Sequence, residues 1–442
     1  MLKSFIDIFK IPELKKKVLI TLGLIAVCRV GTAVPIPGVN PAALRSLFEV
    51  HRNSLLGFLD MFSGGALSRL SVFSLGVIPY INASIIMSLL QGAHIIPYLD
   101  HLAKEGEHGR RKLTQLTRYV TVLLACIQSF GLTMMISRMP TPGGLPIVEN
   151  PTLGFTLITI LTLVTGTIFV MWLGEQITEF GVGNGISLII FAGIVDRLPG
   201  SIKDFFRLLR LEEISLLSAL VLVVLVLAVV TAVVWVETAQ RKIPVQYAKR
   251  IIGRKMYGGA STFLPLKVDQ AGVIAVIFAI SVLTAPLTFL QFFPNSPIAQ
   301  KLSGFWNRGS IIYEIIYAVL IIFFCYFYNS IIINPQELAE NMKKWGGFIP
   351  GIRPGESTAK YIQSIIEKIT LGGAIFVVLI AILPDFLRNL FNAPFFFGGT
   401  ALLIVVGVAL DTIGQLESQM IMRHYEGFMK HGRIKGRWFN IK

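Results

Sequence analysis

Histidines are the residues best suited to metal or proton chemistry, and three of them are regularly spaced. His94, His101 and His108 recur every seven residues, which could place them on one face of a helix. However, Pro97 and Gly106 interrupt any such helix, and metal-binding histidine pairs favour a shorter spacing. The pattern therefore predicts solvated loop residues and no metal site.

Acidic residues inside apolar segments are the second candidate, because ion-coupled transporters mark their pathway with buried ionisable groups. The deepest of them is Asp411, in the last apolar segment. It could lie on an ion pathway, or it could simply approach the cytoplasmic end of a long helix; both alternatives remain open. The chain has no P-loop, HExxH, GxSxG or dinucleotide-binding glycine pattern. We therefore predict no nucleotide hydrolysis, no enzymatic activity and no cofactor.

Composition defines the class of protein that must position these residues. Of 442 residues, 54% are hydrophobic and only 15% are charged, whereas soluble domains carry about 25% charged residues. The 31 phenylalanines exclude disorder, and the three isolated cysteines (Cys28, Cys126 and Cys325) exclude a disulfide scaffold and indicate neither a redox pair nor a zinc site. A polytopic membrane protein is the class that remains.

Ten segments meet or approach the roughly 20 apolar residues that a membrane-spanning helix needs. They are residues 18–34, 71–93, 115–137, 153–173, 184–198, 214–236, 271–291, 310–333, 369–387 and 398–421. An even number of spans places both termini on the same side. Of the 40 Lys and Arg residues, 27 lie on that side and 11 on the other. Basic loops resist translocation, so both termini are predicted to be cytoplasmic.

The net charge of +15 is concentrated in two long cytoplasmic loops, 237–269 and 334–368, and in the C-terminal tail. It could reflect topology and attraction to anionic lipid, or docking of an acidic or RNA-containing partner. The length of the loops favours docking, because far fewer residues suffice to connect two helices. Their Gly and Pro turns predict structured projections.

Two segments depart from a simple helical bundle. Residues 54–70 are moderately apolar, too short to cross and contain Asp60, Arg69 and the pair Gly64-Gly65, which indicates a re-entrant or interfacial segment. In the second span, Pro79 predicts a bend and Asn82 places an amide inside the membrane. The glycines around Asn184 predict close helix packing at the start of the fifth span.

Several of these stretches resemble the SecY family, the channel subunit of the bacterial protein-conducting translocon. The similar stretches are MFSGGALSRLSVFSLGVIPYINASIIMSLL (61–90), GVGNGISLIIFAGIV (181–195), STFLPLKVDQAGVIAVIFA (261–279), GFIPGIRPGESTAKYI (347–362) and FGGTALLIVVGVALD (397–411). The resemblance implies an all-α fold of ten transmembrane helices, in two inverted five-helix halves around an hourglass pore. The halves would be residues 1–200 and 213–442, joined by a hinge loop at 201–212.

The resemblance also implies a set of site residues. Segment 54–70 would be the plug of the resting channel, with the matching positions Phe58, Met61, Phe62, Gly64, Gly65, Leu67 and Arg69. Asn82 and Ala285 would face each other across a lateral gate through which apolar segments enter the lipid. Six branched apolar side chains would form the pore constriction: Val77, Ile81, Ile186, Ile190, Ile277 and Ile404.

The partners implied by the resemblance are SecE, SecG, the SecA ATPase, the ribosome, signal sequences and nascent or precursor polypeptides. Arg254, Lys255 and Arg353 match the positions at which the family's cytoplasmic loops contact the driving partner. Loop 174–183 departs from the pattern, because it carries Glu175 and Glu179 and no basic residue, which argues against a contact with ribosomal RNA. The expected location is a bacterial inner membrane. The alternative hypothesis is an ion-coupled secondary transporter of a small solute.

Overall fold

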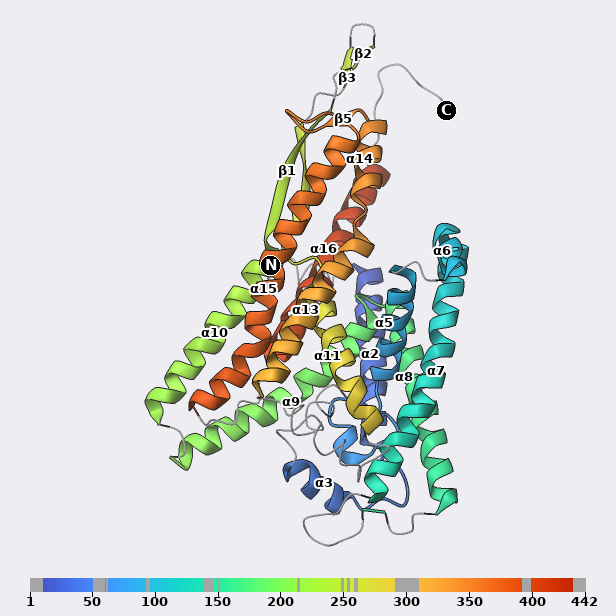
Figure 1. Cartoon of the computed structure of the whole chain (residues 1–442), viewed down its shortest axis with the longest axis vertical. Coiled ribbons are helices and arrows are strands. Elements are labelled where there is room, and N and C mark those ends of the chain that lie inside the picture. The colour runs from blue at the N-terminus through green and yellow to red at the C-terminus, as the bar shows by residue number, and fades with distance from the viewer. Residues whose placement is uncertain are drawn as a thin grey trace.

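Long helices dominate the computed structural model, which describes residues 11–50, 60, 63–92, 96–138, 147–148, 152–212, 215–247, 250–252, 255–257, 261–290, 310–391 and 399–431 (Figure 1). Each predicted span coincides with one helix of the described chain. These helices are α2 (Pro12–Ala33), α5 (Ile78–Gly92), α7 (Gly106–Arg138), α8 (Leu153–Phe180), α9 (Gly185–Arg210), α10 (Leu216–Thr238), α11 (Gly272–Leu290), α13 (Ile311–Ile332), α15 (Glu356–Phe391) and α16 (Gly399–His431). Seven segments within them are long and apolar enough to cross a membrane. The prediction of an all-α polytopic membrane protein is confirmed.

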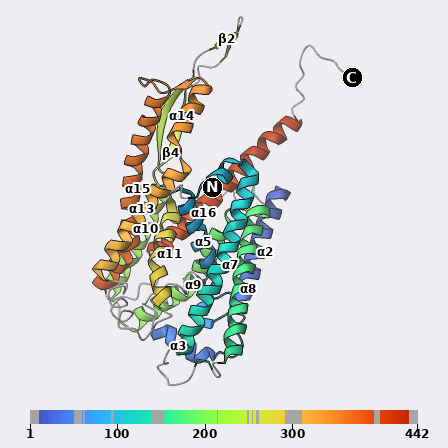
Figure 2. The same cartoon turned by 45° about the vertical axis from the view of Figure 1, so that its right-hand side comes forward.

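The helices form two groups that follow the order of the chain. In Figure 2, α2, α7 and α8 lie on one side, α10, α13 and α15 lie on the other, and α16 crosses between them. Two short helices, α3 (Pro41–Val50) and α6 (Pro97–Lys104), belong to the first group. Many large apolar side chains face outward, among them Leu216, Leu220 and Leu227 on α10. An apolar exterior of this kind is stable against lipid and unstable against water.

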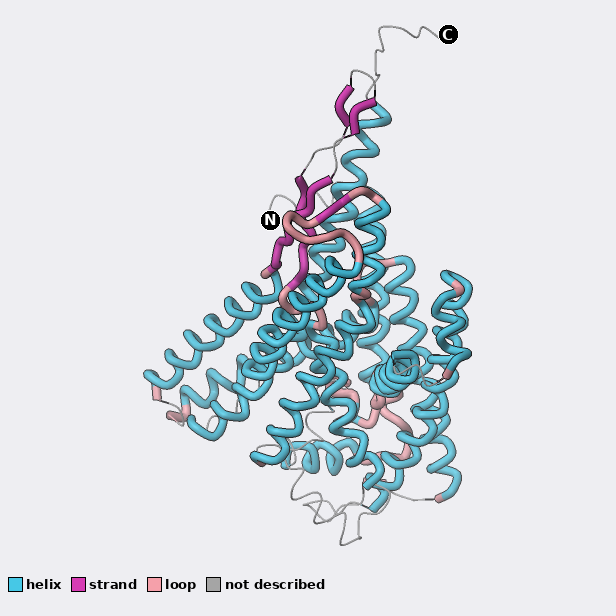
Figure 3. Tube along the Cα trace, turned by 45° about the horizontal axis from the view of Figure 1, so that its top comes forward, coloured by secondary structure: helices cyan, strands magenta, loops and turns pink. Residues whose placement is uncertain are grey.

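The two long loops fold together into one small sheet, which lies at the end of the molecule opposite α3 (Figure 1); its strands are among the magenta segments of Figure 3. Strand β1 (Gln240–Tyr247) pairs antiparallel with β4 (Ser261–Lys267) and with β5 (Gly347–Phe348), giving the order β4-β1-β5. Strands β2 (Arg250–Ile252) and β3 (Lys255–Tyr257) form a second pair, and α14 (Pro335–Lys344) precedes β5. Alternate residues of β1, Ile243 and Val245, are buried, as expected for a strand with one covered face. The loops are therefore structured projections, as the turn residues predicted.

The predicted hinge loop at 201–212 is wrong for residues 201–210, which continue α9 beyond Pro199 to Arg210. The better-covered positions are spaced at helical intervals: Ser201, Asp204, Phe205, Leu208 and Leu209. An amphipathic pattern of this spacing stabilises a helix with one face on the protein. The chain therefore turns only after Arg210.

The predicted bend at Pro79 is also wrong. Residues 72–77 form turns, and α5 begins at Ile78, so Pro79 lies in the first helical turn. The first turn of a helix tolerates proline, because its N–H group would have no partner within the helix. The second span is accordingly a 15-residue helix with an irregular start.

Glycines allow the closest contacts of the first helical group. A Cβ atom on Gly166 of α8 would lie 2.0 Å from the carbonyl oxygen of Val72, and one on Gly185 of α9 would lie 1.9 Å from the carbonyl oxygen of Gly174. Backbone oxygens cannot move aside as side-chain ends do. These contacts fix α8 against the start of the second span and against α9, as the glycines around Asn184 predicted.

We expect Gly166→Val to destabilise the protein by about 1–3 kcal/mol or more, because the added atoms overlap the backbone of Val72. Thermal unfolding of the purified protein in detergent measures the effect. The matched control is Gly154→Val on the same helix, where the nearest atom to an added Cβ is 3.9 Å away. Equal melting temperatures for the two variants would contradict the assignment of this close contact.

Candidate functional site

Five of the six residues predicted to form the constriction belong to one apolar cluster in the centre of the protein. Val77 precedes α5, Ile81 lies on α5, Ile190 on α9, Ile277 on α11 and Ile404 on α16, and their exposure ranges from 0% to 8%. The cluster thus joins helices of both groups.

The sixth residue, Ile186, lies at the edge of this cluster and is only partly buried. Its side chain is directed toward α8, where a Cβ atom on Gly174 would lie 2.5 Å from its Cδ1 atom. The structure therefore brings five predicted residues into the core of the cluster and leaves Ile186 at its margin.

The start of α9, which carries Ile186 and Ile190, is held by side-chain hydrogen bonds. Asn184 caps the helix, because its Oδ1 atom accepts a hydrogen bond from the Ser187 N–H group at 3.2 Å. The Thr178 hydroxyl accepts from the Gly185 N–H group at 2.9 Å, and the Thr21 hydroxyl accepts from the Val182 N–H group at 3.0 Å. These bonds position α9 against α8 and α2 without placing a polar group in the cluster.

The described part of the predicted plug consists of Asp60 and residues 63–70; Phe58, Met61 and Phe62 lie outside the described residues. Residues 67–69 form the 3₁₀ helix η1 (Leu67–Arg69), in which Leu67 is buried and Arg69 is exposed. The carbonyl oxygen of Leu70 accepts a hydrogen bond from the Ile36 N–H group at 2.9 Å. This bond ties the segment to the chain that follows α2. Gly64 and Gly65 both have positive φ angles, which favour glycine.

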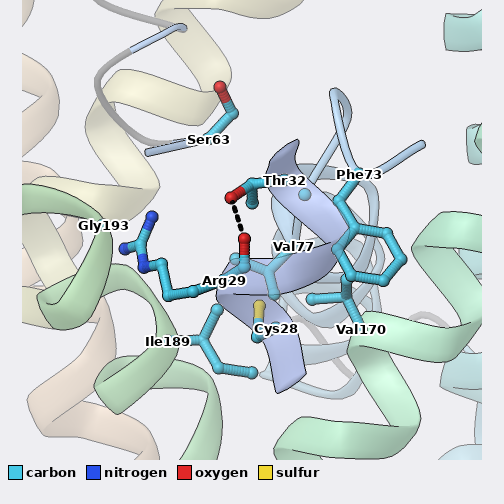
Figure 4. Close-up of a pocket in the computed structure, with 10 residues that line it drawn as sticks. Cys28, Arg29, Thr32, Ser63, Phe73, Val77, Val170, Ile189 and Gly193 are labelled. Carbon is cyan, nitrogen blue, oxygen red and sulfur yellow. Dashed lines mark hydrogen bonds between the residues drawn. The ribbon is translucent and has the colours of Figure 1, made fainter. Parts of the chain in front are cut away.

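Two arginines bind this segment, and the sequence analysis assigned a role to neither. Arg29 of α2 donates a hydrogen bond to the carbonyl oxygen of Gly64 at 3.4 Å, and Arg197 of α9 forms an ion pair with Asp60. The only signal in the sequence was the presence of basic residues at the ends of apolar segments. Figure 4 shows the small cavity beside Arg29, which Ser63, Val77 and Gly193 also line.

The predicted lateral gate lies between helices that are in contact. Asn82 is half-buried on α5, and α5 contacts both α11 and α13. Ala285 lies on α11, but its side chain is outside the described part of the structure. A Cβ atom on Gly92 of α5 would lie 2.9 Å from the Phe327 ring of α13. Helix α5 thus packs against both α11 and α13, which follow it in the second half of the chain.

The predicted docking residues lie on the sheet end of the molecule. Arg353 is exposed in the turn between β5 and α15, flanked by Gly351 and Gly355, which both have positive φ angles. Lys255 pairs through its backbone with Ile252 in the β2–β3 hairpin. Arg254 lies outside the described residues.

Asp411 lies near the sheet rather than among the central apolar residues. Its side chain is 73% exposed, and its Oδ1 atom is 3.6 Å from the Nζ atom of Lys267 at the end of β4. Nearby, burial raises the pKa of Asp269 to about 6, although the Gly272 N–H group and Lys267 oppose the shift. Asp411 lies within α16 (Gly399–His431), about 20 residues before its end, so the predicted position near the end of a helix is wrong. No cluster of three or more potential metal-ligating side chains occurs within the described residues.

Solved structures define the class of this fold. A structure of a protein conducting channel matches with a TM-score of 0.65 at 18% identity, covering 97% of this chain and 99% of that one. Sec61 in the canine ribosome-channel complex from the endoplasmic reticulum matches with a TM-score of 0.60 at 16% identity, over 97% of this chain and 99% of that one. The fold is therefore that of the protein-conducting channels.

Sequence similarity identifies the family. The family model SecY matches residues 71–413. The chain is 46% identical over 424 residues to the protein translocase subunit SecY of Aquifex aeolicus, covering 96% of this chain and 98% of that protein. It is 47% identical over 427 residues to that of Escherichia coli, covering 96% of each. The chain belongs to the SecY family.

We expect Ile190→Asn and Ile404→Asn to increase ion leakage through the resting protein in a planar bilayer. An asparagine amide that stabilises water in the cluster by about 1.4 kcal/mol raises about tenfold the fraction of molecules in which the cluster contains water. The control is Ile158→Asn, on the outward face of α8 where the side chain is 56% exposed. Conductance no greater in the cluster variants than in this control would contradict the role of the cluster as a seal.

Proposed function

We propose that this chain is the pore-forming subunit of a protein-conducting channel, which passes unfolded polypeptides across the membrane and catalyses no reaction. The observation that carries the proposal is the central cluster, in which branched apolar side chains from α5, α9, α11 and α16 meet. Such side chains exclude water and ions by dewetting. They also make no hydrogen bonds, so they can separate around a polypeptide of any sequence.

This proposal includes a ring of six side chains that closes the pore: Val77, Ile81, Ile186, Ile190, Ile277 and Ile404. Ile186, at the margin of the core, would complete the ring by turning its side chain from Gly174 toward the other five residues. Residues 54–70 act as the plug on one side of the ring. The contacts of Arg29 and Arg197 with this segment support a seated, resting state.

The lateral gate opens between α5, with Asn82, and α11, with Ala285. A passing segment then contacts lipid and partitions according to its composition. An apolar segment of roughly 20 residues gains free energy by moving into the bilayer, whereas each charged residue at its centre costs about 2.5–3.5 kcal/mol. Sorting between export and membrane insertion is therefore an equilibrium preference, and the gate supplies the barrier.

The sheet end docks the partners that supply the driving force, namely the SecA ATPase or the ribosome. Arg353 is exposed between two glycine turns, and a guanidinium group held in this way can bind carboxylate or phosphate groups in a bidentate manner. Arg254 and Lys255 contribute from the other loop. The small subunits SecE and SecG complete the complex, and signal sequences and nascent polypeptides are its substrates.

The excess of Lys and Arg at the sheet end and in the terminal segments supports an orientation with both termini in the cytoplasm. The membrane is the bacterial inner membrane. The two halves, residues 1–200 and 213–442, move relative to each other about the turn that follows α9.

Ion-coupled transport of a small solute is the second candidate function. It requires an ionisable group on a path through the membrane, and Asp411 was its main support. The ion pair of this exposed carboxylate with Lys267 favours the channel.

Reconstitution tests the proposed function directly. With SecA, SecE, SecG and ATP, liposomes containing the chain should protect a signal-bearing precursor from added protease. Liposomes without the chain are the control. The same SecA, SecE and SecG must protect the precursor when they are combined with the Escherichia coli relative. If they do so but fail with this chain, the proposal is overturned. Ion-dependent solute uptake by this chain that is lost in Asp411→Asn would also overturn it.

A crosslink across the gate should block export. We expect a chain with Asn82→Cys and Ala285→Cys, in which Cys28, Cys126 and Cys325 are replaced by alanine, to lose precursor protection on oxidation and to regain it on reduction. Each single-cysteine variant is a matched control. Undiminished export by the fully crosslinked protein would contradict the assignment of the gate to α5 and α11.

A further inference from the structure

Asp60 organises the described part of the plug segment and is itself almost fully buried, with 5% of its surface exposed. Its carboxylate accepts a hydrogen bond from the Ser68 N–H group at 2.7 Å. Its carbonyl oxygen accepts one from the Gly65 N–H group at 2.9 Å and another from the Ser63 hydroxyl at 3.0 Å. One residue thus holds together the turn at residues 63–68.

The same residue connects this turn to a transmembrane helix. Arg197 of α9 forms an ion pair with the Asp60 carboxylate and also donates a hydrogen bond to the Asp60 carbonyl oxygen at 2.9 Å. The Arg197 side chain is 34% exposed, so water reaches it, whereas that of Asp60 is only 8% exposed. A buried carboxylate that loses its cation keeps its desolvation cost without compensation.

Arg29 forms a second, weaker connection on the neighbouring helix. Its guanidinium group donates to the Gly64 carbonyl oxygen and lies 3.7 Å from the carboxylate of Asp196, which precedes Arg197 on α9. A Cβ atom on Gly64 would lie 2.4 Å from Arg29, so the arginine packs directly on the turn. The turn is therefore bound by α2 and α9 together.

We propose that Asp60 and Arg197 form an ionic latch that holds the plug seated in the resting channel and that breaks when the plug moves. The proposal rests on the channel function proposed above, and adds to it the residues that set how tightly the resting pore is closed. Because the bond from Ser68 to Asp60 lies within the turn, loss of Arg197 frees the turn from α9 without unfolding it. Once the plug has moved, water solvates both Arg197 and the carboxylate of Asp60, which lowers the cost of separating the pair.

The test of the latch is the ion conductance of the resting complex. The chain is reconstituted with its small subunits in planar bilayers, and the conductance is measured without a translocating polypeptide. We expect Arg197→Gln and Asp60→Asn each to raise the resting conductance about five- to tenfold, which lies within the range for two residues that interact directly. The double variant should leak no more than the leakier single variant, because both changes break the same interaction. Arg207→Gln is the matched control, since this exposed arginine lies on the same helix.

The latch and the channel function fail in different ways. Translocation of a precursor with SecA and ATP is measured on the same preparations, so that each variant is shown to be folded and competent. If the unaltered chain translocates and the Arg197→Gln variant is as tight as Arg207→Gln, the latch is wrong and the channel function stands. Multiplying effects in the double variant would also overturn the latch. If the unaltered chain conducts no precursor, the proposed function itself is wrong.

Discussion

The burial of apolar side chains in a core shared by both helical groups is the constraint on which the rest of this structure depends. Ile81, Ile190, Ile277 and Ile404 come from four helices and are buried together. Contacts between such side chains are numerous and non-directional, so a core of this kind excludes water and would lose no specific bond if its side chains separated. A hydrogen-bonded seal would instead leave unsatisfied groups after each opening.

Because this cluster has no directional bonds of its own, the geometry must be held by its surroundings. Close glycine contacts at Gly166 and Gly185 fix α8 and α9, and the Thr21 hydroxyl holds the turn between them. Charged side chains add a further contact, the ion pair between Asp60 and Arg197 of α9. Close backbone contacts and polar side chains thus hold the helices around the apolar core.

The two long loops show how a membrane protein builds a folded projection from distant segments. Strand β1 pairs with β4 from its own loop and with β5, which lies about a hundred residues further along the chain. The buried Ile243 and Ile349 belong to one apolar cluster beneath this sheet, which also contains Ile362 of α15. Arg353 is therefore carried on a folded platform that is continuous with a transmembrane helix.

The amino-acid sequence by itself determined the class of protein, the positions of its spans and the family, because apolar length and long motifs are local properties of the chain. The family resemblance named six residues for a constriction, five of which are buried in one apolar core, and their role as a ring stays a prediction. Only the tertiary structure decided that residues 201–210 are helical, that Pro79 lies in the first turn of α5, that two loops share a sheet and that Arg29 and Arg197 bind Gly64 and Asp60. These features depend on contacts between residues far apart in the chain, and charge or spacing along the sequence does not specify which partners meet.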